Sequence, residues 1–489
     1  MNQLKSDYTL ADITPAQMAM LDYVAKLTKR PADMIESDIH RLREMGFKDR
    51  AILDINQIAA YYALMDATMI NVGGIIGSGI FMVPATVALY TMSSSLFFTV
   101  WIIGALVSLF GALSVAELGA AMPRAGGQYV YLSEAYGPVW GFLYGWSAVA
   151  VINTASLAAV GVAFGEYLQF FFHLSPLEIR LISISMVVGL TLINIVDVKA
   201  GARFQNGFTI AKVSAIAVVI LLGLTMDGGS IKNLDPLFSG RSLYTLIGPM
   251  GLAMVAVLWT FDGWIFVTYV AGEVKEPNRN IPLSLIYCMA IITTVYLLLN
   301  YTLVYVLGFE VMVNSQMVMS DAASVFMGEQ GAMIITIIIL ISLIGANNGF
   351  TLTSARINYA MAKDGLFFKK AAAVHPKYKS PANALMIQCF WAAFLTFTGT
   401  FNQLITYIIF ASWIFYGMSA GAVIILRKKK PDMERPYRTP LYPWIPAIFI
   451  LFSVFLTINT IMEAPRDAAI GTILVVAGLP LYYYWKKRA

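Results

Sequence analysis

The chain has 489 residues, a net charge of +5, and a composition of 58% hydrophobic but only 12% charged residues. So few charges cannot cover the surface of a soluble protein of this length, which excludes an ordinary soluble globular fold. The apolar residues instead fall into blocks of about twenty, the length at which a helix crosses a hydrocarbon core of roughly 30 Å. Because these blocks lack the alternation typical of membrane β-strands, we expect an all-α membrane protein.

The amino-terminal 62 residues are more polar than the rest of the chain. Apolar residues at helical spacing predict a helix near residues 38–45, ended by Gly46, and a second helix that begins at Asp49. We therefore expect a soluble helical segment over residues 1–62 and a membrane domain over residues 63–489. The segment would pack on the inner loops or on its copy in another subunit. The polar amino terminus also predicts no cleavable signal peptide.

Part of this segment, from Leu21 through Gly46 to Tyr62, resembles the peroxidase-related enzymes of the carboxymuconolactone decarboxylase and alkylhydroperoxidase group. Their chemistry requires a Cys-x-x-Cys pair, because one thiolate attacks and a second thiol resolves the intermediate. The two cysteines of the chain, Cys288 and Cys389, both fall inside predicted spans and are interpreted as small buried residues. We therefore interpret residues 1–62 as a fused fragment and expect no peroxidase activity.

The hydropathy of the remaining chain predicts about twelve transmembrane spans. If the amino terminus is cytoplasmic, the inner loops hold most of the basic residues, including the runs 427–430 and 486–488. This asymmetry predicts that both termini are cytoplasmic, and it explains the positive charge without nucleic acid, through topology and anionic lipids. The predicted spans cover approximately residues 66–90, 95–121, 134–170, 178–196, 204–226, 245–271, 281–308, 331–361, 383–400, 403–426, 442–462 and 468–485.

The first predicted span contains an unusual concentration of glycine, at Gly73, Gly74, Gly77 and Gly79. In a membrane, such helix breakers mark unwound backbone that lines a cavity, where free amides and carbonyls can bind a charged ligand. A Gly-x-x-x-Gly seam for close helix packing would need similar residues. The glycine spacing alone leaves both interpretations open.

The order of residues 74–81, followed by Pro84, resembles the first-span signature of the amino acid–polyamine–organocation superfamily. The resemblance extends over residues 65–489, and within the superfamily residues 259–264 and 435–438 are most similar to the L-type amino acid transporter branch and its bacterial relatives. The supporting motifs occur in the expected order, at residues 116–127, 136–146, 262–277 and 362–367.

This resemblance implies a LeuT-type fold, in which two inverted five-helix repeats with broken helices 1 and 6 precede two additional helices. The carboxylate of the substrate would bind the amides of residues 77–79, and its ammonium group would face carbonyl groups at both breaks. Trp259 would also cover the substrate as an aromatic gate. The substrate-binding residues implied in this way are Ile75, Gly77, Ser78, Gly79, Trp259, Phe261 and Asp262.

Several of these residues allow a structural role as well. Asp262 could bind a proton or substrate, or cap the second half of the broken sixth helix, and we favour the cap. Trp259 and Phe261 could equally be core packing. For other polar groups in the spans, we expect Glu117 to pair with a basic loop residue. Asn347 and Asn348 could bridge helices or line the pathway, and we favour bridging.

Lys212 is predicted to lie midway along the fifth span, too deep to reach water easily. Its ammonium group therefore needs carbonyl or hydroxyl partners, or must lose its proton. The resemblance implies that Lys212 takes the place of a sodium ion and holds the broken first helix against the eighth. The alternative is a lysine with a structural role and no part in transport.

The predicted function is sodium-independent exchange or facilitated passage of L-amino acids, expected to be neutral ones, by alternating access. A proton-coupled amino-acid symporter is the alternative; a nutrient sensor, a channel or a membrane-anchored enzyme is less expected. The expected partners are the amino-acid substrate and the lipid bilayer of the cell (plasma or inner) membrane. We expect no nucleic acid, cofactor or metal, since the three histidines are not clustered.

Mammalian members of the L-type branch attach to a heavy chain through a cysteine between spans three and four. The corresponding loop, residues 173–178, has no cysteine here. We therefore expect no disulfide-linked heavy chain.

Overall fold

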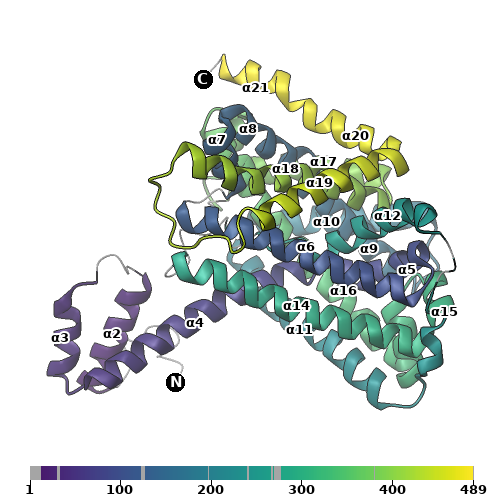
Figure 1. Cartoon of the computed structure of the whole chain (residues 1–489), viewed down its shortest axis with the longest axis horizontal. Coiled ribbons are helices and arrows are strands. Elements are labelled where there is room, and N and C mark those ends of the chain that lie inside the picture. The colour runs from purple at the N-terminus through teal and green to yellow at the C-terminus, as the bar shows by residue number, and fades with distance from the viewer. Residues whose placement is uncertain are drawn as a thin grey trace.

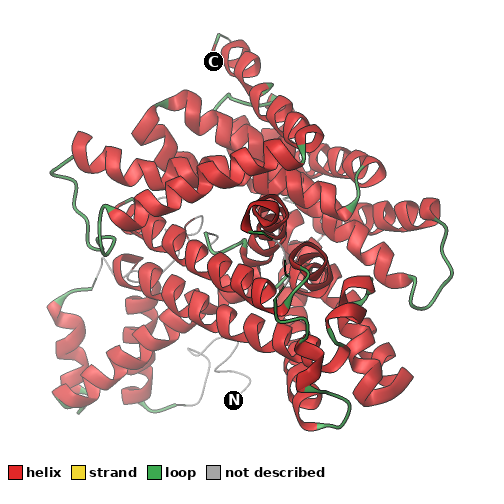
Figure 2. Cartoon of the chain, turned by 45° about the vertical axis from the view of Figure 1, so that its right-hand side comes forward, coloured by secondary structure: helices red, strands yellow, loops and turns green. Residues whose placement is uncertain are grey.

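The computed structural model describes residues 13–29, 34–122, 127–196, 198–238, 240, 242–265, 268, 277–378 and 380–487. This described part is almost entirely helical and contains no strand (Figure 2). Its helices, in chain order, are α2 (Pro15–Lys29), α3 (Glu36–Glu44), α4 (Asp49–Ile75), α5 (Gly79–Thr91), α6 (Ser94–Ala121), α7 (Gln128–Tyr136), α8 (Pro138–Ser147), η3 (Ala148–Ile152), α9 (Asn153–Leu168), α10 (Pro176–Val196), α11 (Val198–Thr225), η4 (Ile231–Leu234), α12 (Leu243–Phe261), α14 (Pro277–Leu307), α15 (Phe309–Asn314), α16 (Val318–Lys363), η6 (Lys369–Ala372), α17 (Ala382–Thr398), α18 (Phe401–Lys429), α19 (Trp444–Glu463), α20 (Pro465–Val476) and α21 (Gly478–Lys486).

Within these residues, eight helices are long and apolar enough to cross a membrane, and four shorter apolar helices accompany them. The resulting twelve correspond to the spans predicted from hydropathy, so the prediction of an all-α, multi-pass membrane protein is confirmed. The third span is formed by α8, the π-helical turn η3 and α9 in succession, and it begins at Pro138 rather than near residue 134.

The amino-terminal unit consists of α2, α3 and the first turns of α4. Its small apolar core is built around Tyr23, Leu42 and Ile52. Lys26 Nζ lies 2.7 Å from a carboxylate oxygen of Asp38, which joins α2 to α3 across the surface of the unit. Figure 1 shows this unit, in purple, standing apart from the main helical bundle.

Helix α4 connects the two parts without interruption, because it begins at Asp49 in the amino-terminal unit and ends at Ile75 inside the bundle. The predicted helix start at Asp49 is confirmed. The boundary predicted between residues 62 and 63 falls within this helix, so the two parts are joined by a continuous helix rather than by a flexible linker.

Inside the bundle, α14 packs against both α4 and α6, while α11 packs along α16. Their contact residues are mostly aliphatic and aromatic, as expected where packing rather than a hydrophobic driving force holds helices together in lipid. This arrangement surrounds the inner end of α4, where the chain leaves the helical conformation.

Candidate functional site

The first predicted break is present between α4 and α5. Residues 76–78 are non-helical, and α5 begins again at Gly79. The first amides of a helix have no intrahelical partner and carry the positive end of its dipole. The amino terminus of α5, which is buried inside the bundle, is therefore suited to bind an anion.

The second predicted break is present at the end of α12. The helix stops at Phe261, and Gly263 has a φ of 107°, a left-handed conformation that glycine adopts without strain. Among the residues that would form the second half of this span, most of 266–276 lie outside the described residues. The predicted capping of that half helix by Asp262 therefore stays a prediction.

The two breaks meet at Gly79. A Cβ atom at this position would lie 3.0 Å from both Cα and Oγ1 of Thr260, and 3.2 Å from Cδ1 of Trp259. These distances are tighter than nine in ten real Cβ contacts, so a side chain at position 79 would require Thr260 or Trp259 to shift by a few tenths of an ångström. The two interrupted helices, far apart in the sequence, thus form one site.

Two hydrogen-bonding groups at this site have no partner within the described part of the chain. The hydroxyl of Ser78 and the indole Nε1 of Trp259 are both buried and unpaired there. Leaving such groups unpaired costs about 1–3 kcal/mol each, so both donors are available to a polar ligand. Both can donate hydrogen bonds beside the positive end of α5.

The carbonyl side of the site is held by Tyr296, from α14. Its buried hydroxyl lies 3.2 Å from the carbonyl oxygen of Ile75 and 3.2 Å from that of Thr260, and it donates to both. Sequence reasoning did not identify Tyr296, because a tyrosine in an apolar span is typical of packing and no motif includes it.

The two predicted aromatic residues differ in their environment. The ring of Trp259 stacks on Phe350 of α16, with centroids 6.5 Å apart and planes 15° apart, beside the break. The ring of Phe261 instead packs against Trp101 and Tyr296, at centroid distances of 6.1 and 5.3 Å. The structure therefore favours the packing role for the side chain of Phe261. A role of its backbone in substrate binding stays a prediction.

Asp262 accepts a hydrogen bond of 2.6 Å at Oδ1 from the hydroxyl of Tyr416, which lies on α18. The ring of Tyr416 also contacts Trp264 in the turn after α12, with centroids 5.1 Å apart. Sequence reasoning missed Tyr416 for the same reason as Tyr296. The side chain of Asp262 is thus held by a residue of the neighbouring helix α18.

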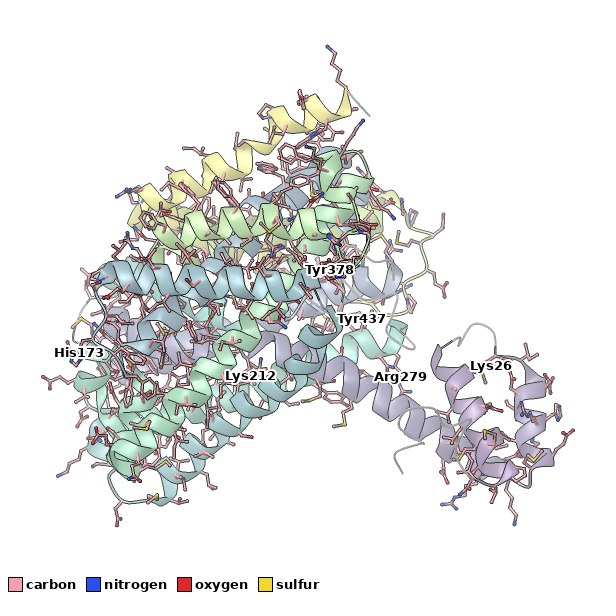
Figure 3. The ribbon with its side chains drawn as sticks, turned by 180° about the vertical axis from the view of Figure 1, so that it is seen from behind. Lys26, His173, Lys212, Arg279, Tyr378 and Tyr437 are labelled. Atoms are coloured by element: carbon pink, nitrogen blue, oxygen red, sulfur yellow. The ribbon has the colours of Figure 1, made fainter. Side chains whose placement is uncertain are left out.

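Lys212 lies on α11 with a side chain that is buried at 2% exposure (Figure 3). Its Nζ donates hydrogen bonds to the carbonyl oxygens of Gly73, at 2.5 Å, and of Ile76. These carbonyls belong to the last turn of α4 and to the break itself, where helical partners are lost. The ammonium group has the carbonyl partners that its burial requires, and α11 packs along α16.

The remaining polar predictions are confirmed as bridges between helices. Asn347 donates to the carbonyl of Leu157 on α9 at 3.1 Å, and Asn348 accepts from Asn194 on α10 at 2.7 Å. Glu117 accepts two hydrogen bonds, of 2.8 and 2.7 Å, from the guanidinium of one arginine, Arg427. That partner lies in the last turn of α18 rather than in a loop.

A loop residue joins this second cluster as well. Arg435 lies 3.6 Å from Glu117, and the backbone amide of Thr439 donates to the same carboxylate at 2.8 Å. The predicted pairing of Glu117 with a basic loop residue is therefore confirmed, with Arg427 as an additional and closer partner. This cluster fixes the loop after α18 to the end of α6.

The twelve apolar helices of the described residues, two of which end where they meet, are those of a multi-pass membrane protein. The chain belongs to the amino acid permease family, since the family model described as "Amino acid permease" matches residues 63–481. The match begins at residue 63 and does not show the predicted likeness of residues 1–62 to peroxidase-related enzymes.

Characterised transporters are similar to nearly the whole chain. The serine/threonine exchanger SteT of Bacillus subtilis is 33% identical over 436 residues, covering 88% of this chain and 98% of the relative. The b(0,+)-type amino acid transporter 1 of Mus musculus is 31% identical, covering 92% and 93%. The large neutral amino acids transporter small subunit 2 of Mus musculus is 33% identical, covering 87% and 81%.

Proposed function

We propose that the chain moves neutral L-amino acids across the cell membrane by sodium-independent exchange. The observation that carries this proposal is the meeting of the two breaks, where unpaired donors at Ser78 and Trp259 lie beside the start of α5. An amino acid carries one anionic and one cationic group a short distance apart, and the site has donors and carbonyl acceptors side by side. The names of the relatives, which include an exchanger and two amino acid transporters, support the same substrate class.

In this proposal the substrate carboxylate binds the amides of Gly77, Ser78 and Gly79, assisted by the Ser78 hydroxyl. The ammonium group binds carbonyl oxygens at the ends of α4 and α12, where the helix dipoles are negative. The carbonyls of Ile75, Trp259 and Asp262 are the proposed acceptors. Alternating access then opens the site first to one side of the membrane and then to the other.

Lys212 is proposed to replace a sodium ion in this mechanism. A bound cation at this place would bridge the unwound carbonyls of the first span to neighbouring helices, and the ammonium of Lys212 already donates to two of those carbonyls. A permanent side-chain cation needs no dissolved ion, which makes transport independent of sodium. Proton coupling through this lysine is the second candidate mechanism.

The test is uptake into proteoliposomes that contain the purified full-length chain. Radiolabelled L-serine and L-leucine are offered outside, with and without the same amino acid inside, in sodium or choline buffer. We expect uptake to depend on internal amino acid and not on sodium. Uptake that follows a pH gradient into empty liposomes would favour the proton-coupled symporter, and no uptake under any condition would overturn the proposal.

We further propose that both termini are cytoplasmic, that residues 1–62 form a separate unit without enzymatic activity, and that residues 63–489 carry transport. The start of the family match at residue 63 supports this division. We also propose that no heavy chain is linked by a disulfide. One relative is itself named a small subunit, so the point needs a test. A band that shifts on non-reducing gels of native membranes would contradict the absence of a disulfide-linked heavy chain.

A further inference from the structure

Tyr296 occupies a special position, because its hydroxyl lies between the carboxyl ends of both interrupted helices. Ile75 is the last residue of α4, and Thr260 is the residue before the last of α12. The final carbonyls of a helix have no intrahelical donor, so the Tyr296 hydroxyl supplies a hydrogen that neither half helix can supply for itself.

The geometry of this contact shows that one hydrogen serves two acceptors. Both oxygen–oxygen distances are 3.2 Å, whereas an unshared O–H···O bond is usually about 2.7–2.8 Å long. Each carbonyl oxygen has two lone pairs, so each keeps capacity to accept a further hydrogen bond. The Ile75 carbonyl is therefore held in place without being fully occupied.

The ring of Tyr296 fixes the hydroxyl at this point. It is fully buried and packs edge-on against Trp101 and Phe261, with centroids 6.0 and 5.3 Å away. Such packing leaves the ring little freedom, so the hydroxyl is aimed at the two carbonyls by the core rather than by the ligand.

We infer that Tyr296 is a positioning residue for the substrate's ammonium group: its shared hydroxyl orients the Ile75 carbonyl and ties the carboxyl ends of α4 and α12 together. This role of Tyr296 rests on the proposed amino-acid function: the side chain makes the ammonium subsite select amino acids over hydroxy acids. When the ammonium group binds the Ile75 oxygen, the hydroxyl can shift toward the Thr260 carbonyl. Substrate binding at the end of α4 then changes the hydrogen bonding at the end of α12.

The inference is tested by Tyr296→Phe, which keeps the ring and removes only the hydroxyl. Inhibition of exchange is measured for L-serine and L-leucine and for L-glycerate and L-2-hydroxyisocaproate, their counterparts with a hydroxyl in place of the ammonium. We expect the half-inhibitory concentrations of the amino acids to rise about three- to tenfold, as for loss of one neutral hydrogen bond. Those of the hydroxy acids should stay unchanged, as should the maximal exchange rate at saturating amino acid.

Tyr287→Phe is the matched control, because Tyr287 lies on the same helix with its side chain 50% exposed. If the amino acids and the hydroxy acids weaken equally in Tyr296→Phe, or if neither weakens, the inference is overturned while the proposed function stands. If the wild-type chain binds neither amino acid, the proposed function itself fails. Should the phenylalanine variant not fold, 3-fluorotyrosine at position 296, a stronger donor of nearly the same size, must keep or increase the preference for amino acids over hydroxy acids.

Discussion

The amino-terminal unit and the centre of the bundle are stabilised in opposite ways. In the unit, charged side chains pair near water, as in the contact of Lys26 with Asp38, around a small apolar core. At the centre, the charged group of Lys212 is buried and is paired with backbone carbonyls rather than with a carboxylate. Pairs near water contribute little to stability, whereas removing one partner of a buried charged contact costs much more. Loss of one of the two buried charged residues of the described bundle, Glu117 or Lys212, is therefore expected to cost more stability than loss of a charged pair at the surface.

The largest effect is expected for Lys212→Ala, which removes the buried cation at the first break. The carbonyls of Gly73 and Ile76 lose their charged donor, and two such bonds correspond to about 3 kcal/mol, or about 100-fold in exchange rate. Exchange in proteoliposomes measures the loss. Lys232→Ala, in the short helix η4, is the control and should leave exchange unchanged. Full activity of Lys212→Ala with an unaltered pH dependence would exclude the coupling role.

An intermediate effect is expected for Gly79→Ala, which tests the closeness of the two breaks. The added methyl group would lie 3.0 Å from the backbone of Thr260, and such overpacking costs about 1–3 kcal/mol. We expect about tenfold slower exchange and a lower melting temperature in detergent. Gly189→Ala on α10 is the control, since a methyl group there meets no atom within 4 Å. Equal exchange rates and melting temperatures of the two variants would show that the close contact of α5 with α12 is not required.

The smallest effect is expected in the amino-terminal unit, where the Lys26 ammonium and the Ile35 amide hold the pKa of Asp38 below its ordinary value of 3.8. Because the pKa is lower in the folded state, the contribution of Asp38 to stability is present above the unfolded pKa. It is lost as the pH falls through the folded pKa. The protection factors of the α3 amides, which correct for the pH dependence of intrinsic exchange, should therefore fall below pH 4, and Asp38→Asn should lower them already at pH 7.

Asp54→Asn is the control for this pH effect, because Asp54 is an exposed carboxylate of the same unit. The melting temperature of the bundle should not change in either variant. A bundle that melted earlier in Asp38→Asn would show that its stability depends on this surface pair.

Much of this architecture could be predicted from sequence, because membrane spans and glycine-rich breaks are local signals. The glycines around residues 76–78 indicate the interruption there, and the need of Lys212 for carbonyl partners follows from the cost of an unpaired charge in lipid. The long-range contacts could not be predicted in this way. Tyr296 and Ile75 are 221 positions apart, and only the packing of α14 against α4 brings them together. The packing of the Phe261 ring against Trp101 and Tyr296 could not be predicted either, because neither neighbour belongs to the motif of Phe261.

The unbroken course of α4 has a mechanical consequence. A helix of 27 residues is about 40 Å long, with one end at the central site and the other in the amino-terminal unit. A rigid tilt of α4 by about 10° around Ile75 would therefore displace its other end, at Asp49, by about 7 Å. A fluorescent or spin label on the surface of the amino-terminal unit would therefore report a small tilt of α4 as a large displacement. An antibody bound to the same unit would restrict the tilt of α4.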